Sequence, residues 1–277
     1  MLTLRRTSIL TLLTLLPLTA ALVAAAPAGP ASAAGASSPA KYHRLVIPFG
    51  ANKSTNWSGY NQGTVEQGSK LFNQISGTWT VPTATQHKAG EAENSSSWIG
   101  IGGGCVDASC TATDASLIQT GTEQDVAANG TPSYSAWWEI IPAPSLTIST
   151  MKVSPGDTMH ANIAEVVPFS DVWTITLQDQ TKGETFTQTV PYASTHLTAE
   201  WITETPTLIG TSGASLAAMP NLSGANFSAA KTNSAGAGLK PSEEIQLVTS
   251  SGQVLATPSA PNGTADGFSV CTYSGTC

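Results

Sequence analysis

The sequence predicts an all-β fold, a single two-sheet antiparallel β-sandwich. From about residue 53 the chain consists of short runs rich in β-branched and aromatic residues, separated by Gly, Pro, Asn, Asp or Ser. No apolar pattern at the helical period extends beyond two turns. About thirteen such runs with frequent turn signals are typical of an antiparallel sandwich that forms one domain.

Each expected strand is bounded by turn-forming residues. The first half of the domain contributes the runs 57–61, 71–81, 97–102, 116–124, 133–141 and 146–149. The second half contributes the runs 158–167, 172–178, 184–190, 198–204, 245–249, 253–256 and 267–272. Residues 206–242 are rich in Gly, Ala, Ser and Asn, and there the sequence predicts long loops.

The first residues of the chain predict export. Arg5 and Arg6 form a basic start, an apolar run follows over residues 9–26, and small residues stand at 31–33. This three-part layout is typical of a secretory signal peptide, which we place at residues 1–34. We therefore expect a secreted, extracellular protein.

A membrane anchor is the alternative interpretation of this apolar run. Pro27 and Pro30 interrupt the run before it reaches the ~20 clean apolar residues that a span requires, and no second hydrophobic span follows. We expect no membrane association after cleavage. Residues 35–52, which include His43, are interpreted as a linker or short pro-segment, and residues 53–277 as one domain that is expected to be monomeric.

The charge of the chain argues against two classes of partner. Loss of the two N-terminal arginines with the signal peptide leaves nine basic against 18 acidic residues, a net charge of about −9. Nucleic acid and anionic lipid would repel such a surface. Only 10% of the residues are charged, against about 25% in ordinary soluble domains, which is compatible with acidic surroundings.

Four cysteines allow three pairings. Export favours disulfides, and the short spacings favour Cys105–Cys110 and Cys271–Cys277. A zinc site is the alternative, but the spacings are not CxxC and no histidine lies nearby. We expect no metal and no cofactor.

The motifs of the common hydrolases are missing from the sequence. It contains no HExxH, no GxSxG, and no Asp-Thr/Ser-Gly pair of the aspartic proteases. A Ser–His–Asp arrangement stays open, although no local motif favours it. Oxidised cysteines would supply no thiolate nucleophile.

Two glutamates stand in unusually apolar company. Glu139 lies in SAWWEII and Glu200 in HLTAEWITE, where an ionised carboxylate requires a partner. At a strand period of two, Glu139 shares a face with Trp137, and Glu200 shares one with Ile202. Gln119, in LIQTG, is an isolated amide in a similar run. Such faces are typical of a substrate cleft on one sheet; a sandwich with a partly solvated outer sheet has the same pattern.

Seven sequence blocks follow one another in order along the chain. The blocks are NWSGY (56–60), GTWTVP (77–82), SWIGIGG (97–103), LIQTG (117–121), YSAWWEIIP (134–142), PGD (155–157) and AEWITE (199–204). This ordered set resembles the glutamic peptidases, the eqolisins. The resemblance implies a sandwich of two curved sheets, of the concanavalin A-like or jelly-roll type, and an exported acid endopeptidase that acts on proteins or peptides. It also implies that Gln119 and Glu200 form the catalytic pair.

The resemblance assigns a role to each candidate residue. Glu200 would activate water as general base and then act as acid, and Gln119 would stabilise the oxyanion. Trp57, Trp98, Trp137 and Glu139 match positions that line the family's cleft, with core packing as the alternative for each tryptophan.

Three positions depart from the family pattern, and a second function class stays open. Gly102 stands where the family often has aspartate, Ser135 where it often has another acid, and Ile141 where it has an aromatic residue. The alternative function is a secreted carbohydrate-binding or glycoside-hydrolysing β-sandwich, in which Glu139 and Glu200 would be the carboxylate pair. A non-catalytic binding module is a further alternative.

Overall fold

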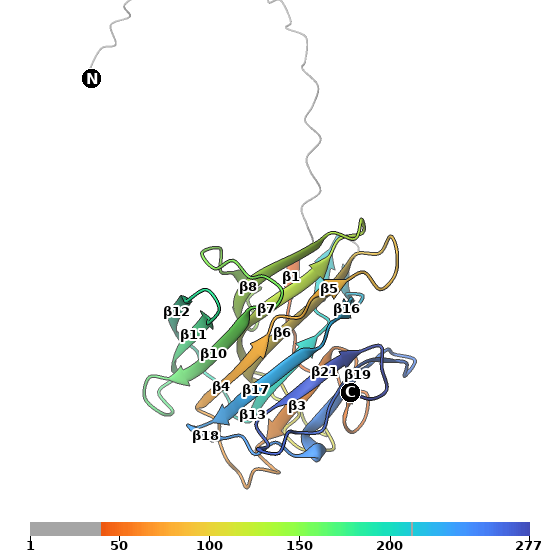
Figure 1. Cartoon of the computed structure of the whole chain (residues 1–277). Coiled ribbons are helices and arrows are strands. Elements are labelled where there is room, and N and C mark those ends of the chain that lie inside the picture. The colour runs from red at the N-terminus through yellow and green to blue at the C-terminus, as the bar shows by residue number, and fades with distance from the viewer. Residues whose placement is uncertain (1–39, 212) are drawn as a thin grey trace, which may run out of the picture. The chain divides into compact units, whose positions relative to one another are not determined.

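The computed structural model describes residues 40–211 and 213–277. Within these residues the chain folds as two curved antiparallel sheets that pack face to face (Figure 1). The predicted all-β sandwich is therefore confirmed. The signal peptide expected at residues 1–34 lies outside the described residues.

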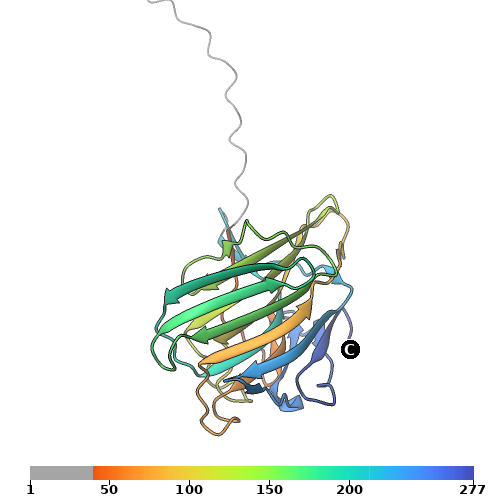
Figure 2. The ribbon, with the colours of Figure 1, turned by 60° about the vertical axis from the view of Figure 1, so that its left-hand side comes forward.

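The first sheet, called here the outer sheet, is seen nearly face-on in Figure 2. Its strands run in the order β12, β11, β10, β4, β17, β21, β20 and β19. Their bounds are Glu184–Pro191, Val172–Asp179, Thr158–Glu165, Gln74–Thr80, Ala225–Thr232, Phe268–Thr272, Val254–Pro258 and Glu244–Val248. All neighbouring strands in this sheet are antiparallel.

The second sheet, called here the site sheet, continues from β19, which pairs with β20 on one edge and with β3 on the other. Its further order is β3, β13, β6, β7, β8 and β9. Their bounds are Trp57–Gly63, Thr198–Glu204, Glu93–Gly102, Leu117–Val126, Pro132–Ile140 and Leu146–Thr147.

Short elements complete the fold. β1 (Ala40–Tyr42), β14 (Thr207–Gly210) and β15 (Gly213–Leu216) form a small sheet, and β16 (Asn221–Leu222) pairs with β5 (Ala84–Thr85). β2 (Lys53–Ser54) pairs with β19, β18 (Ala235–Gly236) pairs with β17, and Pro241–Glu243 form one turn of 3₁₀-helix. No helix in the described part of the chain is long and apolar enough to cross a membrane.

The main hydrophobic core lies between the two sheets. Trp201 of the site sheet reaches across to β4, where its Nε1 donates to the Ser76 carbonyl at 2.9 Å. A Cβ on Gly77 would lie 2.7 Å from the Trp201 ring, so this position must lack a side chain for the sheets to approach. Alternate residues of the site sheet, such as Ile99 and Ile101, fill the same core.

The opposite face of the site sheet carries a second apolar cluster. Trp57, Trp98, Leu117, Trp137 and Ile202 belong to it. We call this surface the site face. Side chains alternate between the two faces along each strand. Polar residues that lie two or four positions from these apolar residues therefore also project from the site face.

The strands agree with the sequence analysis except in one region. Every predicted run overlaps an observed strand. The prediction of long loops over 206–242 is wrong, because β17 is an eight-residue strand between β4 and β21. Its sequence, ANFSAAKT, has few β-branched residues, and its burial alternates mainly through small side chains.

The predicted disulfides are confirmed. Cys105 is bonded to Cys110 and Cys271 to Cys277. The described residues include no free cysteine. Each bridge closes a loop of only a few residues, so it restricts a local segment more than the whole fold.

Candidate active site

A row of five residues crosses the site sheet at right angles to its strands. Each is paired with the next in the strand register. Directly opposed residues project from the same face of a sheet. In order, the row contains Asn61 of β3, Glu200 of β13, Gly100 of β6, Gln119 of β7 and Glu139 of β8. The fold thus places the predicted pair, Gln119 and Glu200, on one face, two strands apart.

Gly100 separates the two members of this pair. Neighbouring strands are about 4.8 Å apart, so the backbones of Glu200 and Gln119 are about 10 Å apart. A Cβ on Gly100 would lie 3.0 Å from the Trp98 ring and 3.2 Å from the Cβ of Gln119. A larger residue at this position would therefore press on Trp98, Leu117 and Gln119.

The three predicted tryptophans lie on the site face beside this row. Trp98 Nε1 donates to Glu204 Oε2 at 2.9 Å, and Trp137 Nε1 donates to Ser96 Oγ at 3.0 Å. Trp57 meets Trp98 edge to face, with ring centroids 4.9 Å apart. Their indoles are fixed by hydrogen bonds and by one another, which is what a rigid cleft wall requires.

Glu200 is completely buried, and neither of its carboxylate oxygens has a hydrogen-bond partner of normal geometry among the described residues. Burial, together with the charge of Asp114, raises the pKa of Glu200 well above its usual value. A buried carboxyl group without a partner is costly to a fold. A buried carboxyl group with a raised pKa and no partner is a candidate for chemistry.

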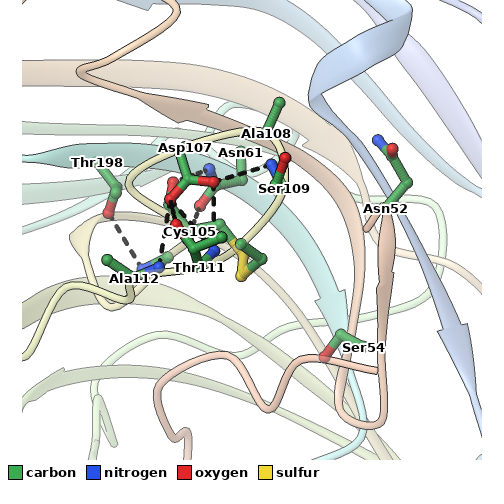
Figure 3. The surroundings of a disulfide bond; sticks show 12 residues. Asn52, Ser54, Asn61, Cys105, Asp107, Ala108, Ser109, Thr111, Ala112 and Thr198 are labelled. Atoms are coloured by element: carbon green, nitrogen blue, oxygen red, sulfur yellow. Dashed lines mark hydrogen bonds between the residues drawn. A yellow bond between two sulfur atoms is a disulfide. The ribbon is translucent and has the colours of Figure 1, made fainter. Parts of the chain in front are cut away.

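The loop closed by the Cys105–Cys110 disulfide is attached to β3 through Asn61 (Figure 3). Asn61, the neighbour of Glu200 in the row, donates to the Cys105 carbonyl at 2.8 Å and accepts from the Cys105 N–H at 2.9 Å. Within the loop the Asp107 carboxylate accepts several backbone N–H groups. Asn61 is thus held by two bonds, and it forms one wall of the Glu200 environment.

Gln119 is held by its neighbour in the row. Its Nε2 donates to Glu139 Oε2 at 2.8 Å and to the carbonyl oxygen of His43 at 2.8 Å. Burial, together with the charge of Glu204, raises the pKa of Glu139 to about 8 against the opposing effect of His43. Glu139 is therefore neutral in acid and accepts the amide without a competing charge.

His43 lies at the centre of the site face, although the sequence analysis placed it in the segment before the domain. Its ring is fully buried and stacks on Trp137, with centroids 3.7 Å apart and planes 7° apart. Its Nδ1 lies 3.1 Å from Glu204 Oε2 and its Nε2 lies 3.5 Å from Glu123 Oε1. Burial opposes the charge, but the hydrogen bonds to these carboxylates outweigh it and raise the pKa of His43 to about 10.

Glu123, Glu204 and His43 are the site residues that sequence reasoning missed. A signal exists for the two glutamates, because Glu123 follows Gln119 by an even number on β7 and Glu204 follows Glu200 by an even number on β13. No pattern places His43, because it lies in a segment without regular structure.

One group of side chains in the described part of the chain has the spacing of a metal site. Glu165, Asp171 and His196 each offer a ligand atom within 4.8 Å of the others. None of them belongs to the row. His196 Nε2 lies 3.2 Å from Glu165 Oε1, and the Glu165 carboxylate accepts from the backbone N–H groups of Phe169 and Asp171, so local contacts account for the arrangement.

Gly100→Ala should lower both the rate of the reaction and the stability of the fold. The added methyl would lie 3.0 Å from the Trp98 ring and 3.2 Å from the Cβ of Gln119, and overpacking of this kind typically costs about 1–3 kcal/mol. We expect at least about tenfold lower activity, since a small displacement of a reacting group has effects of this size. The control is Gly210→Ala, where a Cβ meets no atom within 4 Å. Equal activity of the two variants would show that the reaction does not depend on the packing between Gly100 and Gln119.

The chain is similar in sequence to known peptidases. The sequence model of the peptidase A4 family matches residues 55–270. Aspergillopepsin-2 of Aspergillus niger is 26% identical over 224 residues, with 73% of each chain covered.

Two solved structures with the same fold are glutamic peptidases. Scytalido-glutamic peptidase, in complex with a transition state analog inhibitor, has a TM-score of 0.59 at 19% identity, over 79% of this chain and 98% of that chain. Aspergilloglutamic peptidase from Aspergillus niger has a TM-score of 0.51 at 24% identity, over 65% and 99%. The family match spans well over half of the sequence, and the chain therefore belongs to the peptidase A4 family, the eqolisins, and is a glutamic endopeptidase.

Proposed function

We propose that this protein is a secreted acid endopeptidase that hydrolyses peptide bonds with a Gln119–Glu200 dyad. The observation that supports the dyad best is the row itself: an amide and a partnerless buried carboxyl group on one face, with the bare Gly100 between them. An amide suits an oxyanion site in acid, because it keeps its N–H donors at every pH.

The reaction uses one water molecule per peptide bond. Ionised Glu200 takes a proton from this water, and the resulting hydroxide adds to the scissile carbonyl carbon. The Gln119 Nε2–H donates to the oxyanion that forms. Collapse of the tetrahedral intermediate breaks the C–N bond, and Glu200 returns its proton to the leaving amine, which leaves a new carboxyl group and a free dyad.

The tryptophans of the site face are proposed to bind the substrate. Trp57, Trp98 and Trp137 present large rigid apolar surfaces, and Glu139 holds Gln119 in orientation. A related structure, SCP-B, is in a complex with the tripeptide Ala-Ile-His, which supports a peptide as the occupant of such a cleft. We propose no metal, no cofactor and no nucleic-acid partner.

The row disfavours the carbohydrate alternative. Glu139 and Glu200 lie three strands apart, about 14 Å between backbones. The carboxyl groups of glycosidases are typically about 5–9.5 Å apart. In addition, Glu139 is bonded to Gln119, which stands between the two acids.

The secreted location is proposed from several features together. The first 34 residues have the layout of a signal peptide. Two disulfides suit an oxidising compartment. We propose that the domain works as a monomer outside the cell and without a membrane.

The rate should depend on pH through two carboxyl groups of the row. Glu200 must be ionised, so the rate rises as pH rises through its pKa. Glu139 must be neutral, because its ionised form would compete with the oxyanion for the Gln119 amide, so the rate falls as pH rises through a pKa of about 8. Burial is the main cause of both shifts. Exposure of the cleft to solvent lowers the pKa values of both carboxyl groups, and the pH range in which the enzyme is active therefore moves toward acid.

Glu139→Gln tests this explanation. We expect the loss of activity on the alkaline side to move to higher pH, because the variant keeps an acceptor for Gln119 and cannot ionise. The measurement is kcat/KM for a peptide between about pH 3 and pH 9. An unchanged alkaline limb would assign that limb to another group.

The function as a whole is tested by substrate class. We expect the purified protein to cleave a denatured protein at about pH 4 and to leave polysaccharides intact. Proteolysis that peaks above about pH 7 and vanishes at about pH 4 would contradict the assigned roles.

A further inference from the structure

A second buried carboxyl group lies close to Glu200. Asp114 is 1% exposed and lies between β6 and β7. Its N–H donates to the Gly104 carbonyl at 2.8 Å. A Cβ on Gly104 would lie 3.1 Å from Glu200 Oε2, so the Gly104 backbone lies against that carboxyl group. The Gly104 N–H also donates to Thr198 Oγ1 at 3.1 Å. The main chain thus fixes Asp114 to the residue that adjoins the Glu200 side chain.

The two oxygens of Asp114 have different surroundings. Oδ1 accepts from the Ser116 N–H at 2.9 Å, from the Ser116 hydroxyl at 3.0 Å and from the Thr195 hydroxyl. Oδ2 is buried and has no hydrogen-bond partner among the described residues. Three donors favour the ionised form of a carboxyl group, whereas Glu200 has no partner of normal geometry. Of the two carboxyl groups, Asp114 therefore keeps the negative charge and Glu200 keeps the proton.

The charge of Asp114 acts on two neighbouring side chains. Burial is the larger cause and the charge of Asp114 the second that raise the pKa of Glu200 well above its usual value. Burial and the same charge raise the pKa of Tyr192, whose hydroxyl accepts from the Leu117 N–H at 2.6 Å. Tyr192 is therefore neutral in acid. None of the ion pairs among the described residues includes Asp114, so its charge is not neutralised by a cation.

The other titratable groups around Glu200 are bonded elsewhere. Those of the site face lie further along the strands or at the far end of the row and bond to one another or to Gln119: His43, Glu123, Glu139 and Glu204. In the disulfide loop, the Asp107 carboxylate accepts N–H groups of its own loop. Before β13, the His196 ring pairs with Glu165. Asp114 is thus the group whose charge acts on Glu200.

We propose that Asp114 is a positioning residue for the reaction, because it keeps a negative charge beside Glu200 and so determines the pH range in which Glu200 is ionised. The charge makes Glu200 a stronger base toward the attacking water. It then stabilises the protonated Glu200 until the leaving amine takes the proton. This role adds a third residue to the Gln119–Glu200 dyad, and it rests on the proposed peptidase function.

The first test is the pH profile of Asp114→Asn. Asparagine keeps an acceptor for Ser116 and removes the charge. We expect the acid limb of kcat/KM to move to lower pH by about one unit or more, because Glu200 then ionises more readily. Below the acid limb the variant should be faster than the wild type. At higher pH it should be slower, since a less basic Glu200 takes a proton from water less readily. A general loss of structure cannot produce two profiles that cross.

Asp107→Asn is the matched control. It makes the same substitution in the same connection between β6 and β7, at a carboxylate whose pKa is lowered mainly by the Thr111 hydroxyl, and it should leave the acid limb in place. Asp114→Ser is a second uncharged variant, which keeps a shorter acceptor for the Ser116 N–H and should show the same shift as Asp114→Asn. An acid limb that stays in place in whichever of the two Asp114 variants folds would overturn the proposal.

The second test requires no turnover, so it separates this proposal from the proposed function. Full chains with isotope-labelled glutamate side chains are titrated by NMR, and Glu200→Gln identifies the Glu200 signal. We expect the midpoint of the Glu200 titration to lie about one unit or more lower in Asp114→Asn than in the wild type, and to be unchanged in Asp107→Asn. Equal midpoints in Asp114→Asn and the wild type would overturn the proposal, whether or not the enzyme is active. A lower midpoint in a chain without peptidase activity would support the effect of Asp114 and contradict the proposed function instead.

Discussion

Glu200→Gln should lower kcat for peptide hydrolysis by about 10²–10⁴-fold, the usual contribution of a general base. Glutamine keeps the size and shape of the side chain but cannot take a proton from water. The fold should be unaffected, because the buried Glu200 oxygens have no hydrogen-bond partner of normal geometry among the described residues. Far-UV circular dichroism and initial rates at about pH 4 are the measurements.

The same variant should be at least as stable as the wild type at neutral pH. Burial raises the pKa of Glu200, so its contribution to stability is present below the unfolded value and is lost as pH rises through the folded value. A neutral amide removes this loss. Glu91→Gln, on a half-buried glutamate that pairs with Lys88 and lies outside the row, is the control for the substitution. A folded Glu200→Gln variant with near-full activity would contradict the assignment of the base.

Gln119→Ala should lower kcat by about 10²–10³-fold, the usual loss for one oxyanion donor. The variant also leaves Glu139 without the amide that now bonds to it at 2.8 Å, at a stability cost of about 1–3 kcal/mol. KM should change less than kcat, because the donor is needed most in the transition state.

Gln124→Ala is the matched control for Gln119→Ala. Gln124 is equally buried and lies on the same strand, but an odd number of residues away, so its side chain projects from the other face and bonds to Thr122. Any loss of activity from the general cost of a buried Gln→Ala change in β7 should appear in both variants. Equal losses of activity in the two variants would contradict a catalytic role for Gln119.

Much of the fold could be predicted from the sequence, because alternation and turn residues define strands locally. The runs around Gln119 and Glu200 were placed correctly, and alternation alone put each on a face with apolar neighbours. β17 was missed because its small residues give no apolar signal. The order of strands in a sheet cannot be derived from local sequence pattern. The row that contains Gly100, Gln119 and Glu200 could therefore be seen only in the structure.

One departure from the family pattern has a structural reason. Gly102 has a φ of +93°, and a Cβ there would lie 2.2 Å from the Ser116 carbonyl oxygen. No side chain fits, so the aspartate that the family often has is excluded at this position. Ser135 is paired with Glu123, and an acid there would add a charge beside that carboxylate.

His43 was the least predictable residue of the site. It lies between the short strands β1 and β2 and has no motif around it. Its position depends on contacts with Trp137, Glu139 and Glu204, which come from two strands far apart in the sequence. Local sequence pattern cannot predict contacts between residues that lie so far apart in the chain.

The most direct test of the dyad is kcat/KM for acid hydrolysis of one peptide by four proteins: the wild type, Gln119→Ala, Glu200→Gln and the double variant. Because both residues act on the same tetrahedral intermediate, the double variant should lose less than the product of the two single losses. Losses that multiply fully would mean that the residues act independently. A single variant that folds normally and retains near-full activity would contradict the dyad itself.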